Sequence, residues 1–115
     1  MKDEIVYLKH ILECIRRIEE DTHDGHEVFL RTHTLQDAVL RNLQILSEST
    51  QRLSEGSKVK HPDIEWKRIA AFRNFLVHNY LGIDMERIWE IVQRDVPALK
   101  RAALAVLREV EGGVL

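Results

Sequence analysis

The sequence has few of the residues that interrupt helices. Among its 115 residues there are only two prolines and five glycines. A fold of many strands needs many turns, and turns draw on glycine and proline. The scarcity of both therefore favours long helices. A chain of this length predicts one domain, over residues 1–115.

The sequence also has little of what marks secreted, membrane or strongly basic proteins. Its single cysteine, Cys14, excludes an internal disulfide framework and fits a reducing, cytoplasmic environment. No apolar run reaches about 18 residues, so no membrane-spanning helix and no membrane partner are expected. The amino-terminal segment carries acids, unlike a signal peptide. A net charge of −2 lacks the basic excess of proteins that bind nucleic acid by charge alone.

What the chain does have is apolar residues at steps of three and four, the pattern of amphipathic helices. This spacing predicts helices over residues 4–19, 34–54, 64–80, 85–95 and 97–110, and leaves open a short helical turn over 26–31. The predicted fold is all-α, a four- to five-helix antiparallel bundle.

Several local signals set the expected helix boundaries. Thr34 with Asp37 has the spacing of a capping box, and Asp84 suits an N-cap. Residues 55–63 are predicted to be a loop, with Gly56 just past the end of the preceding helix. Pro97 is predicted to lie in the first turn of a separate last helix.

The expected helix over 64–80 is apolar around most of its circumference. Such a helix is either central in the bundle or covered a second time in a dimer. Near its end stands the segment "RNFLVHNY", with four polar residues among apolar ones: Arg73, Asn74, His78 and Tyr80. On a helical wheel Asn74 and His78 are neighbours, while Tyr80 falls on the side of Arg73.

These four residues admit two interpretations. In the structural one, the histidine interacts with the helix macrodipole, the arginine pairs with an acid and the tyrosine packs its ring. In the functional one, a histidine with an unperturbed pKa of about 6.5 transfers protons, and an arginine holds a phosphate in a bidentate fork. That combination suits cleavage of an RNA phosphodiester without a metal or other cofactor.

Other candidate sites each have a simpler explanation. A metal site and a solvated turn compete for Asp21, His23, Asp24, His26 and His33. An RNA-steering patch and a solvated loop compete for Lys58, Lys60, His61, Lys67 and Arg68. Cys14 is expected to be a buried, inert thiol, and both Trp66 and Trp89 are expected to pack in the core. No phosphate-binding loop, dinucleotide fingerprint or Cys-x-x-Cys pair is present.

The extended motif resembles a known family. Arg73 to His78 matches the R-x4-H pattern of HEPN domains (higher eukaryotes and prokaryotes nucleotide-binding), and with Tyr80 it matches the R-x4-H-x-Y form of HepT-like toxins. The flanking segments "HPDIEWKRIAAFRNFLVHNYLGID" and "LQDAVLRNLQILSEST" are also similar to that family, so the resemblance covers residues 1–110. The chain departs from the family at Leu81, where an aromatic residue is common, and at Ser47, where glycine is common.

The resemblance implies a dimeric helical bundle that acts as a metal-independent endoribonuclease toxin. Arg73 and His78 would be catalytic in a composite dimer cleft, with Asn74 supporting. Separately from the resemblance, Lys67 and Arg68 of the basic patch are the residues expected to steer RNA. The implied partner is an MntA-like nucleotidyltransferase antitoxin that silences the toxin by AMPylation of Tyr80. Two alternatives stay open: a non-catalytic regulatory module of a nucleotidyltransferase, and a nucleotide-binding helical dimer without hydrolysis.

Overall fold

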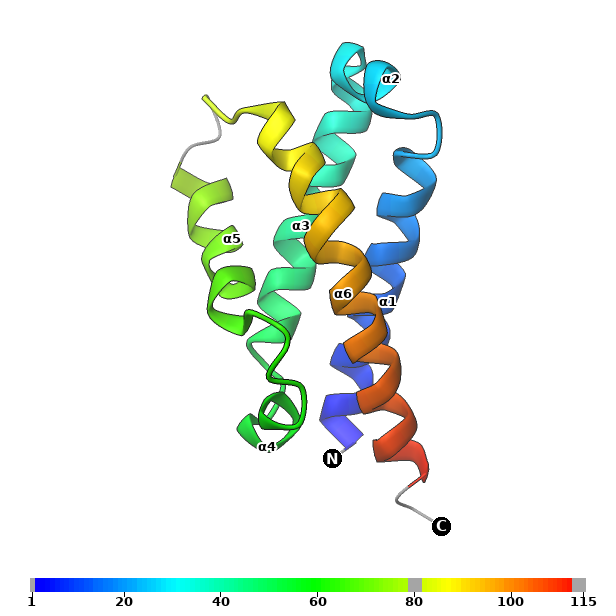
Figure 1. Cartoon of the computed structure of the whole chain (residues 1–115), viewed down its shortest axis with the longest axis vertical. Helices are drawn as coiled ribbons and strands as arrows, with labels where there is room; N and C mark the ends of the chain where they lie inside the picture. Colours follow the sequence, from blue (N-terminus) through cyan, green and yellow to red (C-terminus); the bar gives the residue numbers. More distant parts are fainter. Residues whose placement is uncertain (1, 79–81, 113–115) are drawn as a thin grey trace.

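Six helices make up the described part of the protein. The computed structural model describes residues 2–78 and 82–112, with side chains except at positions 2, 3, 77 and 78. The helices are α1 (Lys2–Asp21), α2 (His26–Arg31), α3 (His33–Thr50), α4 (Glu55–Val59), α5 (Trp66–His78) and α6 (Met85–Gly112). No strand occurs within these ranges, which confirms the all-α prediction. The four longer helices, α1, α3, α5 and α6, run alternately up and down (Figure 1).

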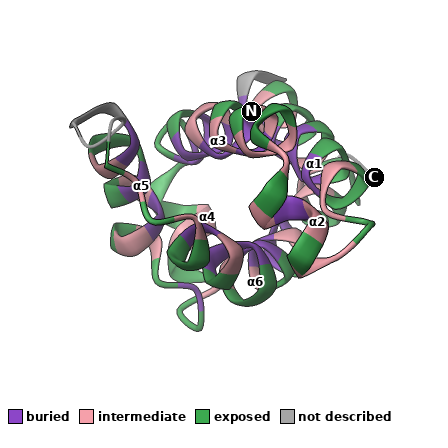
Figure 2. Cartoon of the chain, turned by 90° about the horizontal axis from the view of Figure 1, so that it is seen from above, coloured by how far each residue is buried: buried purple, intermediate pink, exposed green. Residues whose placement is uncertain are grey.

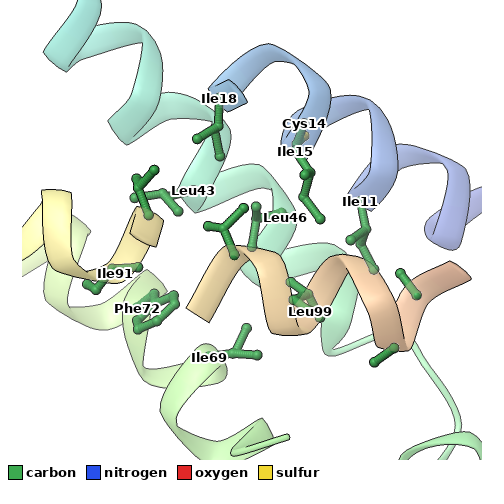
Figure 3. Close-up of a cluster of buried hydrophobic side chains, with 14 of the residues drawn as sticks. Ile11, Cys14, Ile15, Ile18, Leu43, Leu46, Ile69, Phe72, Ile91 and Leu99 are labelled. Carbon is green, nitrogen blue, oxygen red and sulfur yellow. The ribbon is translucent and has the colours of Figure 1, made fainter. Parts of the chain in front are cut away.

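The core lies between the apolar faces of the longer helices. On α1 the fully buried positions are Leu8, Ile11, Ile15 and Ile18, all with 0% exposure, and they recur at steps of three and four. Figure 3 shows side chains of α1 and α3 meeting those of α5 and α6. Each such side chain contributes about 1.5–3 kcal/mol through burial. Within the described ranges no helix is both long and apolar enough to span a lipid bilayer.

α5 lies at the edge of this bundle. It packs chiefly against α3, whereas α1 packs against both α3 and α6 (Figures 1 and 2). The sequence left two explanations for the apolar character of this helix, a central position or a second burial in a dimer. The first is wrong for the single chain, because Lys67, Ala71 and Asn74 on the outer side of α5 are exposed.

The predicted loop over residues 55–63 begins with a helix instead. α3 ends at Thr50, and α4 starts after Ser54, whose Oγ accepts a hydrogen bond from the Ser57 amide at 3.1 Å. Ser54 donates in turn to the buried Glu4 carboxylate of α1, from its amide at 3.0 Å and its hydroxyl at 3.3 Å. Burial opposes the charge of Glu4, but hydrogen bonds from Ser54 and Ser57 outweigh it and lower its pKa. The sequence did not predict this helix, because the residue that binds its N-cap, Glu4, lies 50 positions away from Ser54.

The start of α3 also differs from the prediction. The helix begins at His33 after Thr32, so Thr34 lies inside it and forms no capping box. The Thr32 hydroxyl donates to the Val28 carbonyl at 2.7 Å instead, which joins the end of α2 to the start of α3. At α6 the prediction holds, because the Asp84 carboxylate accepts from the Glu86 amide at 3.0 Å.

The separate last helix is wrong as well, because α6 continues through Pro97. A proline lacks the amide hydrogen that would bond to the carbonyl of Gln93, and its ring crowds that carbonyl. Pro97 and Gln93 are both exposed, so water can satisfy the freed carbonyl. Val96 and Leu99, 3% and 2% exposed, are buried on either side of the proline and hold the helix on the core.

We expect Pro97→Ala to stabilise the protein by about 1–3 kcal/mol, because alanine restores the missing hydrogen bond and has the highest helix propensity. Chemical denaturation followed by circular dichroism measures this change. The exposed neighbour on the same helix provides a control, since Gln93→Ala should change stability by less than about 0.5 kcal/mol. A clear destabilisation by Pro97→Ala would mean that a helix start at Pro97, as the sequence predicted, is the better description.

Candidate active site at the carboxyl end of α5

α5 presents one buried and one exposed side. Its buried side carries Ile69, Phe72 and Leu76, which are 3–6% exposed and lie at steps of three and four. Lys67, Ala71 and Asn74 follow the same helical spacing on the other side and are exposed. α5 thus has a buried apolar side and an exposed side that carries two polar residues and one alanine.

Arg73 lies between these two sides, next to α3. Its Nε donates to Oε1 of Glu48 at 3.3 Å, and the two side chains are 48% and 46% exposed. Asn74, the next residue, is exposed on the outer side. The motif arginine and its neighbouring amide are therefore both accessible to a ligand, although the arginine also has the acidic partner that the structural interpretation expects.

The second half of the motif lies at the limit of the described chain. The backbone of α5 is helical as far as His78, so the four-residue step from Asn74 to His78 is a helical step, as the sequence predicted. The side chain of His78 and the whole of Tyr80 lie outside the described residues. The predicted roles of these two residues stay predictions.

The two residues predicted to steer RNA differ in their surroundings. Lys67 is exposed. Arg68 forms a bidentate pair with Asp95 of α6, with Nε 3.1 Å and Nη2 3.2 Å from the carboxylate oxygens. These hydrogen bonds raise the pKa of the guanidinium. Arg68 therefore joins α5 to α6, and Lys67 is the better candidate for contact with an RNA backbone.

The rest of the basic patch is also balanced by acids. Lys60 and His61 lie 4.0 Å and 3.6 Å from the Glu109 carboxylate at the end of α6. A hollow of about 610 Å³ lies between α4 and the start of α5, and its lining residues are Glu55, Lys58, Val59, Glu65, Trp66, Lys67 and Ala70. Two lysines and two glutamates give this hollow no net charge, so it is not a basic channel for RNA.

The remaining candidates have structural roles. Trp66 donates from Nε1 to the carbonyls of Lys58 and His61, both at 3.1 Å, and so fastens the connection between α4 and α5. The Trp89 ring packs at 5.5 Å from that of Phe29. Both tryptophans are half-buried against the core, in line with the packing role predicted for them.

Cys14 is 5% exposed, and burial raises the pKa of its thiol, as expected for an inert cysteine.

The candidate metal site lay in the region between α1 and α3. There His26 Nε2 lies 2.9 Å from the Glu86 carboxylate of α6. Among the residues that the structure describes, no three His, Cys, Asp or Glu side chains form a group able to hold a metal ion.

Comparison with known proteins identifies the family. The model of the family described as "Ribonuclease HepT-like" matches residues 11–106. The chain therefore belongs to the HepT-like ribonuclease family, as the motif and its flanking segments predicted. The comparison with solved structures gave no significant match.

Relatives in archaea carry names that agree with this family. The "Probable ribonuclease HepT" of Thermococcus cleftensis is 39% identical over 95 residues, which cover 82% of this chain and 86% of that protein. "Putative RNase MJ0127" of Methanocaldococcus jannaschii is 35% identical over 112 residues, covering 96% of this chain and 93% of the relative.

A longer relative carries two activities in its name. "Gamma-glutamylcyclotransferase and putative RNase MJ0434" of the same organism is 40% identical over 111 residues, 96% of this chain. The chain spans only 50% of that protein's length. The ribonuclease part of the name is the part shared with the other relatives.

Sequence reasoning missed Glu48 and Asp95, the acids that bind Arg73 and Arg68. They lie 25 residues before and 27 residues after their partners. Both lie on amphipathic helices, where most acidic side chains face water. Without the packing of α5 against its neighbours, no local signal distinguishes these two.

Proposed function

We propose that this protein is a metal-independent endoribonuclease that acts as the toxin of a toxin–antitoxin pair. The observation that carries the proposal is the position of Arg73. The arginine of the R-x4-H-x-Y motif lies on a solvent-accessible part of α5, in a chain that belongs to a ribonuclease family. The proposed substrate of this protein is RNA, and His78 is the second proposed catalytic residue.

The proposed chemistry follows from the residue types. A neutral His78 takes the proton of a ribose 2′-hydroxyl, the 2′-oxygen attacks the adjacent phosphorus, and the bond to the 5′-oxygen breaks. Arg73 stabilises the negative charge that develops on the phosphate, and Asn74 donates a hydrogen bond to a phosphate oxygen. The leaving 5′-oxygen needs a proton, and in the proposed scheme a second, protonated histidine supplies it, because one copy of the motif holds a single histidine.

A homodimer would supply that second histidine in a composite cleft. The edge position of α5 and its open outer side, with Lys67, Ala71 and Asn74, support this arrangement. Ala71 has a small side chain, which would let a second copy approach closely. Analytical ultracentrifugation tests the dimer, and the specific activity per chain should fall when the protein is diluted below its dimer dissociation constant.

The proposed partner is an MntA-like nucleotidyltransferase that transfers AMP to Tyr80. AMP adds bulk and negative charge two residues beyond His78, and both would oppose an approaching RNA backbone. The protein carries no resident cofactor in this scheme, because ATP is a substrate of the partner enzyme.

Expression without the partner tests the ribonuclease proposal. We expect the wild type to slow growth and degrade cellular RNA, and His78→Ala to do neither, because loss of the general base lowers cleavage about 10²–10⁴-fold. A wild type that neither slows growth nor cuts RNA would contradict the enzyme and favour a regulatory module. A His78→Ala variant as active as the wild type would contradict the site assignment.

The silencing step needs a separate measurement. After incubation with the partner and ATP, the intact mass of the wild type should increase by one or more AMP groups. Tyr80→Phe should show no increase, and Tyr7→Phe, a tyrosine of α1, provides the matched control. If Tyr80→Phe still gains AMP, the modified residue is another one.

A further inference from the structure

Glu48 is the one described residue that holds the motif arginine from another helix. It lies near the carboxyl end of α3, and its Oε1 accepts from Arg73 Nε at 3.3 Å. The same oxygen accepts from Gln44 Nε2, one turn earlier on α3, at 3.4 Å. Glu48 is thus oriented from its own helix and faces α5.

The way in which Glu48 holds Arg73 leaves the phosphate-binding part of the guanidinium available. A guanidinium has five N–H donors, and the two terminal nitrogens together form a fork that matches two phosphate oxygens. Glu48 engages Nε alone. Within the described residues, Nη1 and Nη2 have no hydrogen-bond partner, so the fork remains for a ligand.

Buried side chains anchor the backbone on both sides of this pair. Leu43 and Leu46 of α3, each 1% exposed, lie in the same buried cluster as Phe72 and Leu76 of α5, each 6% exposed. Figure 3 draws Leu43, Leu46 and Phe72 in one cluster of buried side chains. Close packing of this kind limits changes in the separation of the two helices. An arginine side chain alone has many rotamers, whereas one held at Nε from a fixed neighbouring helix has few.

We propose that Glu48 is a positioning residue for the catalytic arginine. It holds Arg73 at Nε so that the terminal nitrogens are directed at the scissile phosphate. The proposal rests on the ribonuclease function proposed above and adds a residue outside the motif to it. The Glu48–Arg73 pair adds little to the stability of the fold, because both side chains are about half exposed and ion pairs of this kind contribute little to folding.

A positioning carboxylate should also weaken the binding of RNA, and this effect makes the proposal testable. Its negative charge lies close to the place where the RNA phosphate must bind, so it weakens ground-state affinity while it improves the orientation of Arg73. Removing Glu48 should therefore lower kcat and also lower KM. A residue with a purely structural role would not change these two constants in this combination.

The experiment measures cleavage of a defined RNA oligonucleotide by the full-length chain at low salt. We expect Glu48→Ala to lower kcat about 10-fold, because a misplaced catalytic group costs one to two orders of magnitude. Its KM should fall about 2- to 3-fold because a repulsive charge is lost. Glu48→Gln should recover most of kcat, since the amide oxygen still accepts from Nε, and should keep the lowered KM.

Two controls separate positioning from loss of an ion pair. Glu19 and Lys100 form a comparable pair between α1 and α6, 2.9 Å apart and 49% and 42% exposed. Glu19→Ala should leave both kinetic constants unchanged. In the Arg73→Ala background, adding Glu48→Ala should cause no further loss of kcat, because Glu48 acts only through Arg73.

The results distinguish failure of the ribonuclease function from failure of the positioning role of Glu48. If the wild type cleaves RNA and Arg73→Ala cleaves it far more slowly, the ribonuclease function stands; unchanged or increased kcat in Glu48→Ala then overturns the positioning role alone. An additive loss in the double variant also overturns it, because Glu48 would then act independently of Arg73. If the wild type fails to cleave RNA, both the function and the inference fall.

Discussion

Replacing Arg73 by alanine is expected to lower kcat/KM for RNA cleavage about 10²–10³-fold, the usual loss when one stabiliser of transition-state charge is removed. Arg73→Lys should fall between the alanine variant and the wild type. Lysine keeps the positive charge, but it cannot present two parallel donors to a phosphate while a third binds Glu48. Steady-state cleavage of an RNA oligonucleotide measures both variants.

Folding should be nearly unaffected by these changes. Arg73 is 48% exposed, and its pair with Glu48 should contribute at most about 1 kcal/mol to stability. Arg16→Ala provides the matched control, because Arg16 is also an exposed arginine paired with glutamates, on α1. It should lose a comparable amount of stability and no activity. If Arg73→Ala retains full activity, the motif arginine is not catalytic in this protein.

Replacing Leu99 by alanine is expected to destabilise the protein by about 2–5 kcal/mol, because the side chain is 2% exposed and its removal leaves a cavity in the core. Leu104 on the same helix is 39% exposed. Leu104→Ala should cost less than about 1 kcal/mol, so the pair of variants compares one chemical change at two depths. Urea denaturation monitored by circular dichroism gives both values.

The position of Leu99 makes this comparison informative about α6. The residue lies two positions after Pro97, where the sequence predicted a break between helices. If Leu99→Ala costs no more than Leu104→Ala, the segment after the proline does not pack on the core as the continuous α6 requires. A large difference supports one helix held across Pro97 by burial on both sides of it.

The catalytic proposal also fits the charge of the chain. Arg68, Lys60 and His61 are basic residues near acids, and the hollow beside Lys67 carries as many glutamates as lysines. RNA would therefore be held by few phosphate contacts per chain. This predicts a shallow dependence of RNA affinity on salt, in contrast to proteins that bind by a broad basic surface.

Much of the fold was predictable because it depends on local pattern. The buried positions of α1 repeat at helical steps that any window of the sequence shows, and Asp84 has the chemistry of an N-cap. The errors at α4 and α6 share one cause. α4 depends on Glu4 of α1, and the continuity of α6 depends on core packing around Pro97. Contacts between distant residues outweighed local signals at both places.

The candidate site, like the fold, was predictable from the sequence only in part. The sequence by itself determined the motif from Arg73 to Tyr80, the helix that carries its first part and the family to which the chain belongs, because these depend on residue order and spacing. Only the tertiary structure decided that α5 lies at the edge of the bundle, that Arg68 is bound by Asp95, and that Glu48 holds Arg73. Such pairings depend on which faces of distant helices meet, and helix packing fixes that only after the apolar sides have been buried.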